Sequence, residues 1–248
     1  MPSIPASTST PSRRAFLSAG AAAPVLSLTG LPASAATPRA AEDRDKLLLG
    51  MVVFEGFQLL DVFGPLEMFG ALRDKVRIVM VAEKPGYARS SAGPAVAIDH
   101  TLADVPKLDI VMIPGGGGTR REVDNVSFVA AFRKLAENTP RVASVCTGAA
   151  VLARTGLIDG VKATTNKRAY QWATSQGSKV DWVKQARWVE DGKYFTSSGI
   201  SAGIDMSLAL IARLFGKQTA LQVAQGAEYE WNEDPHHDPF AKLNGLVD

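Results

Sequence analysis

Short apolar runs alternate with segments of helical spacing from Arg44 onward, and this alternation is the strongest constraint on the fold. The strand-like runs cover residues 46–54, 77–81, 108–113 and 141–145. The segments of helical spacing cover residues 58–72, 127–137, 204–215 and 218–228. Continuous apolar strands alternating with helices predict an α/β fold with a mostly parallel sheet and helices on both faces.

Two regions depart from this order. Residues 87–100 and 180–197 contain short alternating pieces, which we expect to form antiparallel additions to the sheet. The helix in residues 127–137 is expected to be capped by Ser127 or Asn125.

The N-terminal segment has the composition of an export signal. Arg13 and Arg14 form a twin-arginine motif, which precedes a weakly apolar stretch and the small-residue cleavage site of residues 32–35. We therefore expect residues 1–35 to be a twin-arginine signal peptide, after whose cleavage no stable membrane anchor remains. The mature protein is expected to be periplasmic or extracellular. Further boundaries are expected as a linker over 36–44, an α/β domain over 45–240 and a C-terminal tail over 241–248.

Charge and cysteine content narrow the possible roles. Cleavage after Ala35 removes two arginines and no acid, so the formal net charge falls from +2 to 0 and gives no indication of a nucleic-acid partner. About 210 mature residues are enough to bury a core without internal disulfides, which one cysteine cannot form. An unpaired thiol in an exported protein is a candidate reactive group.

That thiol, Cys146, lies where the apolar run of residues 142–145 meets the helix-like residues 147–152. On a strand-to-helix turn, a thiol faces the first N–H groups of the helix, whose partial positive charge favours the thiolate. This placement resembles a nucleophile elbow. The alternative is a small buried core residue, because free cysteine is often buried.

Two other features are predicted at the same edge of the sheet, where α/β proteins bind ligands. The glycine run of residues 115–118 ends a strand and can supply backbone N–H groups as an oxyanion hole, or it is a flexible turn. The run fits neither a phosphate-loop nor a dinucleotide-binding pattern. Asp61 follows the first strand and is either a first-turn carboxylate or an acid/base group.

Five ordered motifs resemble the ThiJ/PfpI superfamily, a class I glutamine-amidotransferase-like group, and among its members the branch of the isonitrile hydratases. The motifs are DVFGPLE at 61–67, IPGG at 113–116, VCTGA at 145–149, LIDG with ATT at 157–165, and GISAGID at 199–205. The resemblance implies a flavodoxin-like fold and a homodimer, and thiolate addition to an electrophilic carbon requires no metal or organic cofactor. It implies Cys146 as nucleophile, Thr147 as its neighbouring hydroxyl and Asp61 as the carboxyl partner. It also implies substrate or oxyanion contacts from Gly115, Gly116, Thr165, Asn166 and Ile200.

Two positions depart from the wider family pattern. Thr147 stands where protease-like and glyoxalase-like members carry histidine, which argues against both activities. Asn166 stands where isonitrile hydratases commonly carry histidine, and an amide cannot shuttle a proton as imidazole can. His236 and His237 lie in the C-terminal segment and are expected to be solvated.

The chemistry that fits these residues is thiolate addition to an electrophilic carbon, with Asp61 supplying and then withdrawing a proton. For an isonitrile substrate, the product would be an N-substituted formamide formed through a thioimidate on Cys146. Because two anions in an apolar pocket are unfavourable, Asp61 and Cys146 are expected to share one proton near neutral pH. Two other functions remain open: a redox or electrophile sensor and a non-catalytic small-molecule-binding domain.

Overall fold

The computed structural model describes residues 45–248. The expected signal peptide, residues 1–35, and linker, residues 36–44, lie outside the described residues. Among residues 45–248, no helix combines the length and the hydrophobicity that a membrane span requires.

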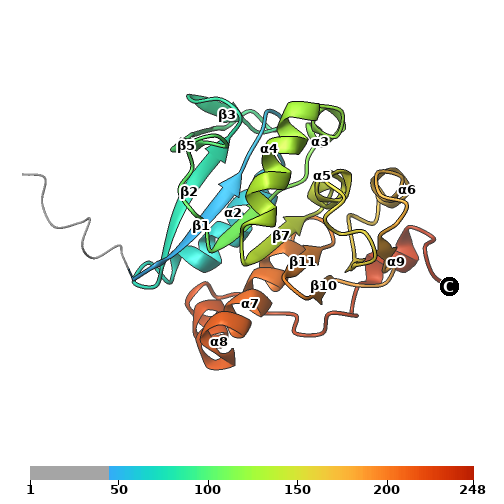
Figure 1. Ribbon diagram of the computed structural model, residues 1–248. Coiled ribbons are helices and arrows are strands. Elements are labelled where there is room, and N and C mark those ends of the chain that lie inside the picture. Colours follow the sequence, from blue (N-terminus) through green and yellow to red (C-terminus); the bar gives the residue numbers. More distant parts are fainter. Residues whose placement is uncertain (1–44) are drawn as a thin grey trace, which may run out of the picture. The chain divides into compact units, whose positions relative to one another are not determined.

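A seven-stranded sheet forms the centre of the described region (Figure 1). Its strands, in spatial order, are β10 (Trp188–Asp191), β11 (Tyr194–Ser197), β7 (Arg141–Val145), β6 (Ile110–Ile113), β1 (Leu47–Val52), β2 (Val76–Ala82) and β5 (His100–Thr101). All neighbouring strands run parallel except β10, which is antiparallel to β11. Almost every side chain of β1, β6 and β7 is buried, as expected for strands covered on both faces.

Helices cover both faces of this sheet. Helices α2 (Leu59–Gly70) and α7 (Ala202–Phe215) pack against each other, and α7 continues into α8 (Lys217–Gly226). Figure 1 shows α4 (Val126–Glu137) in front of the strands and α2 behind them. The Asn125 side chain accepts a hydrogen bond from Phe128 N and so caps α4, which decides between the two expected caps. This architecture confirms the predicted flavodoxin-like α/β fold.

The smaller elements lie in the connections. They are α3 (Thr119–Glu122), α5 (Gly148–Arg154), α6 (Tyr170–Thr174), α9 (Pro239–Leu243), β3 (Tyr87–Arg89), β4 (Ala95–Ala97), β8 (Lys162–Ala163) and β9 (Asp181–Trp182). Strands β3 and β4 form an antiparallel hairpin as expected, whereas β5 joins the main sheet in parallel. Strands β10 and β11 supply the expected antiparallel pair, but β9 pairs in parallel with β8. These departures arise because two- and three-residue strands carry too little periodic signal to fix their pairing.

The C-terminal segment is packed against the domain. Asp238 is buried and its carboxylate caps α9, a helix that crosses the expected boundary between residues 240 and 241. His236 and His237 are exposed next to it. The backbone of Arg187 donates to Pro235 O at 2.6 Å, so the segment is held against the strand end at β10.

Candidate active site

Cys146 lies on a strained turn between β7 and α5. Its φ is 59°, a left-handed conformation that a non-glycine residue rarely adopts. The Cys146 N–H lies 3.2 Å from both Ser197 O and Ser198 O, and its carbonyl accepts a hydrogen bond from Thr165 Oγ1 at 2.9 Å. These contacts hold the strained backbone in place. Cys146 is 6% exposed, so it is buried but not completely closed off from solvent.

Asp61, in the first turn of α2, is the acid partner of this thiol. Its side chain is fully buried, and Oδ2 accepts a hydrogen bond from Gly115 N at 2.9 Å. Within the described residues, Oδ1 has no nitrogen or oxygen partner. A buried carboxylate with one unsatisfied oxygen is costly when it is charged.

Burial therefore dominates the protonation of both groups. Burial raises the pKa of Asp61 to about 7, although hydrogen bonds from Gly115 and Cys146 act in the opposite direction. Burial also raises the pKa of the Cys146 thiol far above its ordinary value, and the charge of Asp61 raises it further. Hydrogen bonds from Thr147 N and the Asn166 side chain lower that pKa without reversing the shift. The expected thiolate preference is therefore not found, because desolvation outweighs the helix N-terminus.

The glycine loop after β6 approaches the site so closely that side chains are excluded. A Cβ atom at Gly115 would lie 2.6 Å from Thr147 N and 2.9 Å from Asp61 Oδ2. Gly115 N binds Asp61, and Gly116 N donates to Thr147 Oγ1 at 3.1 Å. The N–H groups of both predicted oxyanion donors are thus already hydrogen-bonded within the protein. The backbone N–H that faces the sulfur is that of Thr147.

Thr119 was not foreseen in the sequence, although it completes this cluster. Its hydroxyl is buried, donates to Gly116 O at 2.7 Å and lies 3.1 Å from Thr147 Oγ1. The Thr147 hydroxyl is therefore fixed by the glycine loop on one side and by Thr119 on the other. Only its position directly after the glycine run distinguishes Thr119 from other threonines in the sequence.

The opposite side of the site is formed by the segment after β8 and the turn before α7. Asn166 Oδ1 accepts a hydrogen bond from Ala169 N at 2.9 Å, which turns its Nδ2 toward the thiol. A Cβ atom at Gly199 would lie 1.9 Å from Asn166 Nδ2 and 3.1 Å from Cys146 Sγ. Ile200, the next residue, is 38% exposed and lies at the rim. The predicted residues thus meet, with Ile200 outermost.

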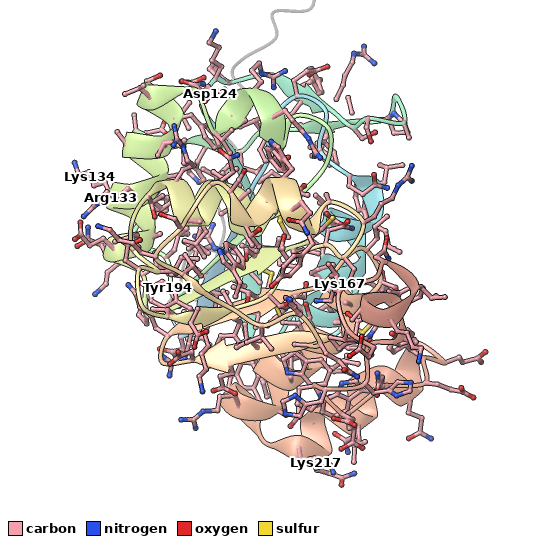
Figure 2. The ribbon with its side chains drawn as sticks, turned by 90° about the vertical axis from the view of Figure 1, so that its right-hand side faces the viewer. Asp124, Arg133, Lys134, Lys167, Tyr194 and Lys217 are labelled. Carbon is pink, nitrogen blue, oxygen red and sulfur yellow. The ribbon has the colours of Figure 1, made fainter. Side chains whose placement is uncertain are left out.

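Two buried ion pairs support this side. Lys167, which is labelled in Figure 2, follows Asn166 and is buried. Its Nζ donates to Thr164 Oγ1 at 2.6 Å and to Ala186 O at 2.9 Å. It also lies 3.6 Å from Asp238 Oδ2, which joins the C-terminal segment to the site. Burial lowers the pKa of Lys167 to about 8. The second pair joins Arg187 Nε to Asp205 Oδ2 at 2.7 Å.

A model of the DJ-1/PfpI family matches residues 49–213. The chain belongs to the DJ-1/PfpI family. This match spans every element that carries Asp61, the glycine loop, Cys146, Asn166 and Ile200, and it confirms the ThiJ/PfpI resemblance of the sequence motifs.

Relatives within and around this DJ-1/PfpI family differ in their functions. The isonitrile hydratase of Pseudomonas putida is 35% identical over 183 residues, covering 74% of this chain and 78% of that protein. The HTH-type transcriptional regulator GbdR of Pseudomonas aeruginosa is 28% identical over 204 residues, a match that covers 79% of this chain and 54% of the regulator. A solved ThiJ/PfpI family protein from Pseudomonas syringae has a TM-score of 0.69 and 29% identity, with 77% of each chain covered. Membership in the family therefore establishes the fold, whereas the activity has to be inferred from the residues of the site.

The part of the chain that the structure describes contains no set of metal ligands. Residues 45–248 contain no group of three or more His, Cys, Asp or Glu side chains placed to hold an ion. The reactive groups that the DJ-1/PfpI fold brings together here are a thiol and a carboxyl.

Proposed function

We propose that this protein hydrates isonitriles to N-substituted formamides, with Cys146 as nucleophile and Asp61 as the proton carrier. The observation that carries the proposal is the buried pair itself: a thiol beside a carboxyl group whose pKa is raised to about 7, close to ordinary operating pH. The identity to an isonitrile hydratase over most of both chains adds support.

In the first step, Asp61 as carboxylate takes the proton of the Cys146 thiol while sulfur bonds to the terminal carbon of the isonitrile. The acid so formed then returns this proton to the same carbon, which leaves a thioimidate on Cys146. A carboxyl group whose pKa lies near 7 can both accept and donate the proton. Because the thiol is protonated at rest, attack and proton removal belong to one event.

In the second step, Asp61 takes a proton from water, and the hydroxide adds to the thioimidate carbon. The proton passes to the substrate nitrogen, the carbon–sulfur bond breaks and the product leaves as a formamide. The hydroxyl proton of the adduct returns to sulfur through Asp61, which restores the starting pair. The Thr147 N–H and the Asn166 amide face the sulfur and stabilise negative charge there.

A redox or electrophile sensor fits the same residues less well. Sensor cysteines react as exposed thiolates of low pKa, whereas burial raises the pKa of Cys146 and leaves it 6% exposed. A purely binding domain gives no reason to place a thiol beside a carboxyl group whose pKa is raised to about 7.

The deciding experiment is turnover of alkyl isonitriles by the purified full-length protein, with formamide production followed by chromatography. We expect turnover by the wild type, none by Cys146→Ala, and a thioimidate adduct on Cys146 detected by mass spectrometry after rapid quenching. Unaltered isonitrile after prolonged incubation with folded wild-type protein would refute the proposal.

We further propose that the protein acts as an exported homodimer. Arg13 and Arg14 support twin-arginine export, and two-fold dimers are the commonest symmetric assembly. Replacing both arginines with lysine should retain the precursor in the cytoplasm, and light scattering at micromolar concentration should give the mass of two chains. Unchanged export of the double mutant would contradict the twin-arginine route, and a monomeric mass would contradict the homodimer.

A further inference from the structure

Arg120 is an exposed arginine whose guanidinium carbon lies over an indole ring. Its Cζ lies 3.9 Å from the centroid of the Trp172 ring, and Nη1 makes a long, 3.5 Å hydrogen bond to Thr119 Oγ1. A guanidinium stacked on an aromatic face keeps its N–H groups at its edge, where they remain available to an acceptor. The stacking therefore fixes the direction of a binding group without consuming it.

This stacked pair joins the two sides of the Cys146 site. On one side, Thr119 lies 3.1 Å from the hydroxyl of Thr147, the residue after the nucleophile. On the other side, Trp172 belongs to α6, the helix that follows Asn166, and the Asn166 side chain holds the backbone of Ala169 just before that helix. The Arg120 guanidinium is thus hydrogen-bonded to Thr119, whose hydroxyl contacts that of Thr147, the residue after the nucleophile.

The positive charge of Arg120 is uncompensated within residues 45–248. No carboxylate of this region forms an ion pair with it. Its neighbour Arg121 differs, because Arg121 Nη2 lies 2.5 Å from Glu122 Oε1 and 2.8 Å from Glu55 O. Of two consecutive exposed arginines, Arg121 therefore has a carboxylate partner within the described chain and Arg120 has none.

We propose that Arg120, held by Trp172, binds the carboxylate of the substrate, so that the isonitriles preferred by Cys146 carry a carboxylate group. One planar guanidinium matches one carboxylate in charge and in the spacing of its N–H groups. This inference rests on the proposed function for the reaction at Cys146, whereas the binding of a carboxylate at Arg120 stands independently.

The first test compares an isonitrile that has a terminal carboxylate with its methyl ester in steady-state turnover by the full chain. For the wild type we expect kcat/KM to be at least tenfold higher for the carboxylate, with the difference in KM. Arg120→Gln should abolish this preference, so that kcat/KM becomes equal for the carboxylate and its ester. Arg120→Lys should keep part of the preference, because it retains charge but not the planar fork. Arg121→Gln, the matched control, should behave as the wild type.

The second test requires no turnover. Alkylation of Cys146 by iodoacetamide is measured in the presence of hexanoate or of hexanamide, two ligands of matched length. Hexanoate should protect the thiol at concentrations at least tenfold lower than hexanamide in the wild type and in Arg121→Gln. In Arg120→Gln the two ligands should protect equally.

The two tests separate the carboxylate site from the reaction. Protection that depends on Arg120 in a protein that does not consume isonitriles would support the site and refute the proposed function. Equal protection by both ligands in the wild type, or a hexanoate preference that survives Arg120→Gln, would overturn the carboxylate site whatever the turnover.

Discussion

Asp61 and Asp205 lie in the first turns of two helices, α2 and α7, that pack against each other, but the two carboxylates have different hydrogen-bond partners. Both carboxylates are fully buried. Asp205 accepts hydrogen bonds from Arg187 Nε at 2.7 Å, Tyr229 OH at 3.0 Å and Asn232 N at 3.0 Å. Asp61 accepts one backbone hydrogen bond and keeps an oxygen without a nitrogen or oxygen partner in the described chain.

The difference separates a structural acid from a reactive one. A first-turn position gives both residues the same interaction with the helix dipole, so the dipole cannot explain the contrast. The partners can, because a guanidinium and two further donors bind Asp205, whereas burial without such partners raises the pKa of Asp61 to about 7. Asp205 is therefore part of a structural network, and Asp61 can exchange a proton.

The largest expected effect is on turnover, and it tests the reactive side of this comparison. Asp61→Asn keeps the shape but cannot carry a proton, so kcat should fall by about 10²–10⁴-fold. Alkylation of Cys146 should persist and shift to lower pH, because the charge of Asp61 raises the pKa of the thiol. The measurement is the alkylation rate against pH beside steady-state turnover. A mutant thiol that becomes inert in proportion to the lost turnover would make Asp61 a structural support only.

Asp205→Ala should have the largest effect on stability. It leaves the buried Arg187 guanidinium without its carboxylate, which costs about 3–5 kcal/mol in the free energy of unfolding. Urea denaturation of the mutant and of Asp61→Asn, both at pH 8, gives the comparison directly. A loss of similar size in Asp61→Asn would erase the distinction between the two acids.

The pH dependence of stability should also differ between wild type and Asp61→Asn. The folded pKa of Asp61, about 7, lies above its unfolded value, so its contribution is fully present below about pH 4 and is lost as pH rises to about 7. From pH 5 to pH 8, the wild type should therefore lose stability relative to the mutant, by as much as about 3 kcal/mol. Parallel urea titrations across this range would show a constant difference if the carboxyl group were charged throughout.

The smallest predicted effect concerns the hydroxyl beside the nucleophile. Thr147→Val removes the acceptor of Gly116 N and the contact with Thr119, a cost of about 1–3 kcal/mol for an unsatisfied buried donor. We expect about tenfold slower turnover, with iodoacetamide alkylation of Cys146 within about twofold of the wild type. A larger loss of alkylation than of turnover would assign Thr147 to thiol activation.

The sequence predicted the fold and the meeting of the reactive groups because both depend on local pattern. Buried strands ending at one edge of a parallel sheet bring Asp61, Gly115 and Cys146 together without knowledge of side-chain packing. The pKa of the thiol was predicted in the wrong direction, because the helix N-terminus is visible in sequence whereas desolvation depends on everything packed around it.

The supporting ion pairs were not predicted for a related reason. Lys167 pairs with Asp238, and Arg187 with Asp205, across segments whose proximity follows only from the tertiary fold. Neither Asp205 nor Asp238 has a local sequence signal that indicates its basic partner. Arg120 follows the glycine run directly, but its contact with Trp172 links residues that no motif connects.

The left-handed backbone at Cys146 sets stability against chemistry during evolution. Glycine adopts a φ of 59° without penalty, whereas cysteine pays about 1–2 kcal/mol for it. A lineage released from selection for the thiol would gain stability by a single change to glycine at this position. Retention of the cysteine therefore carries a cost in stability. How often descendants keep cysteine at this position would measure the strength of selection for its chemistry.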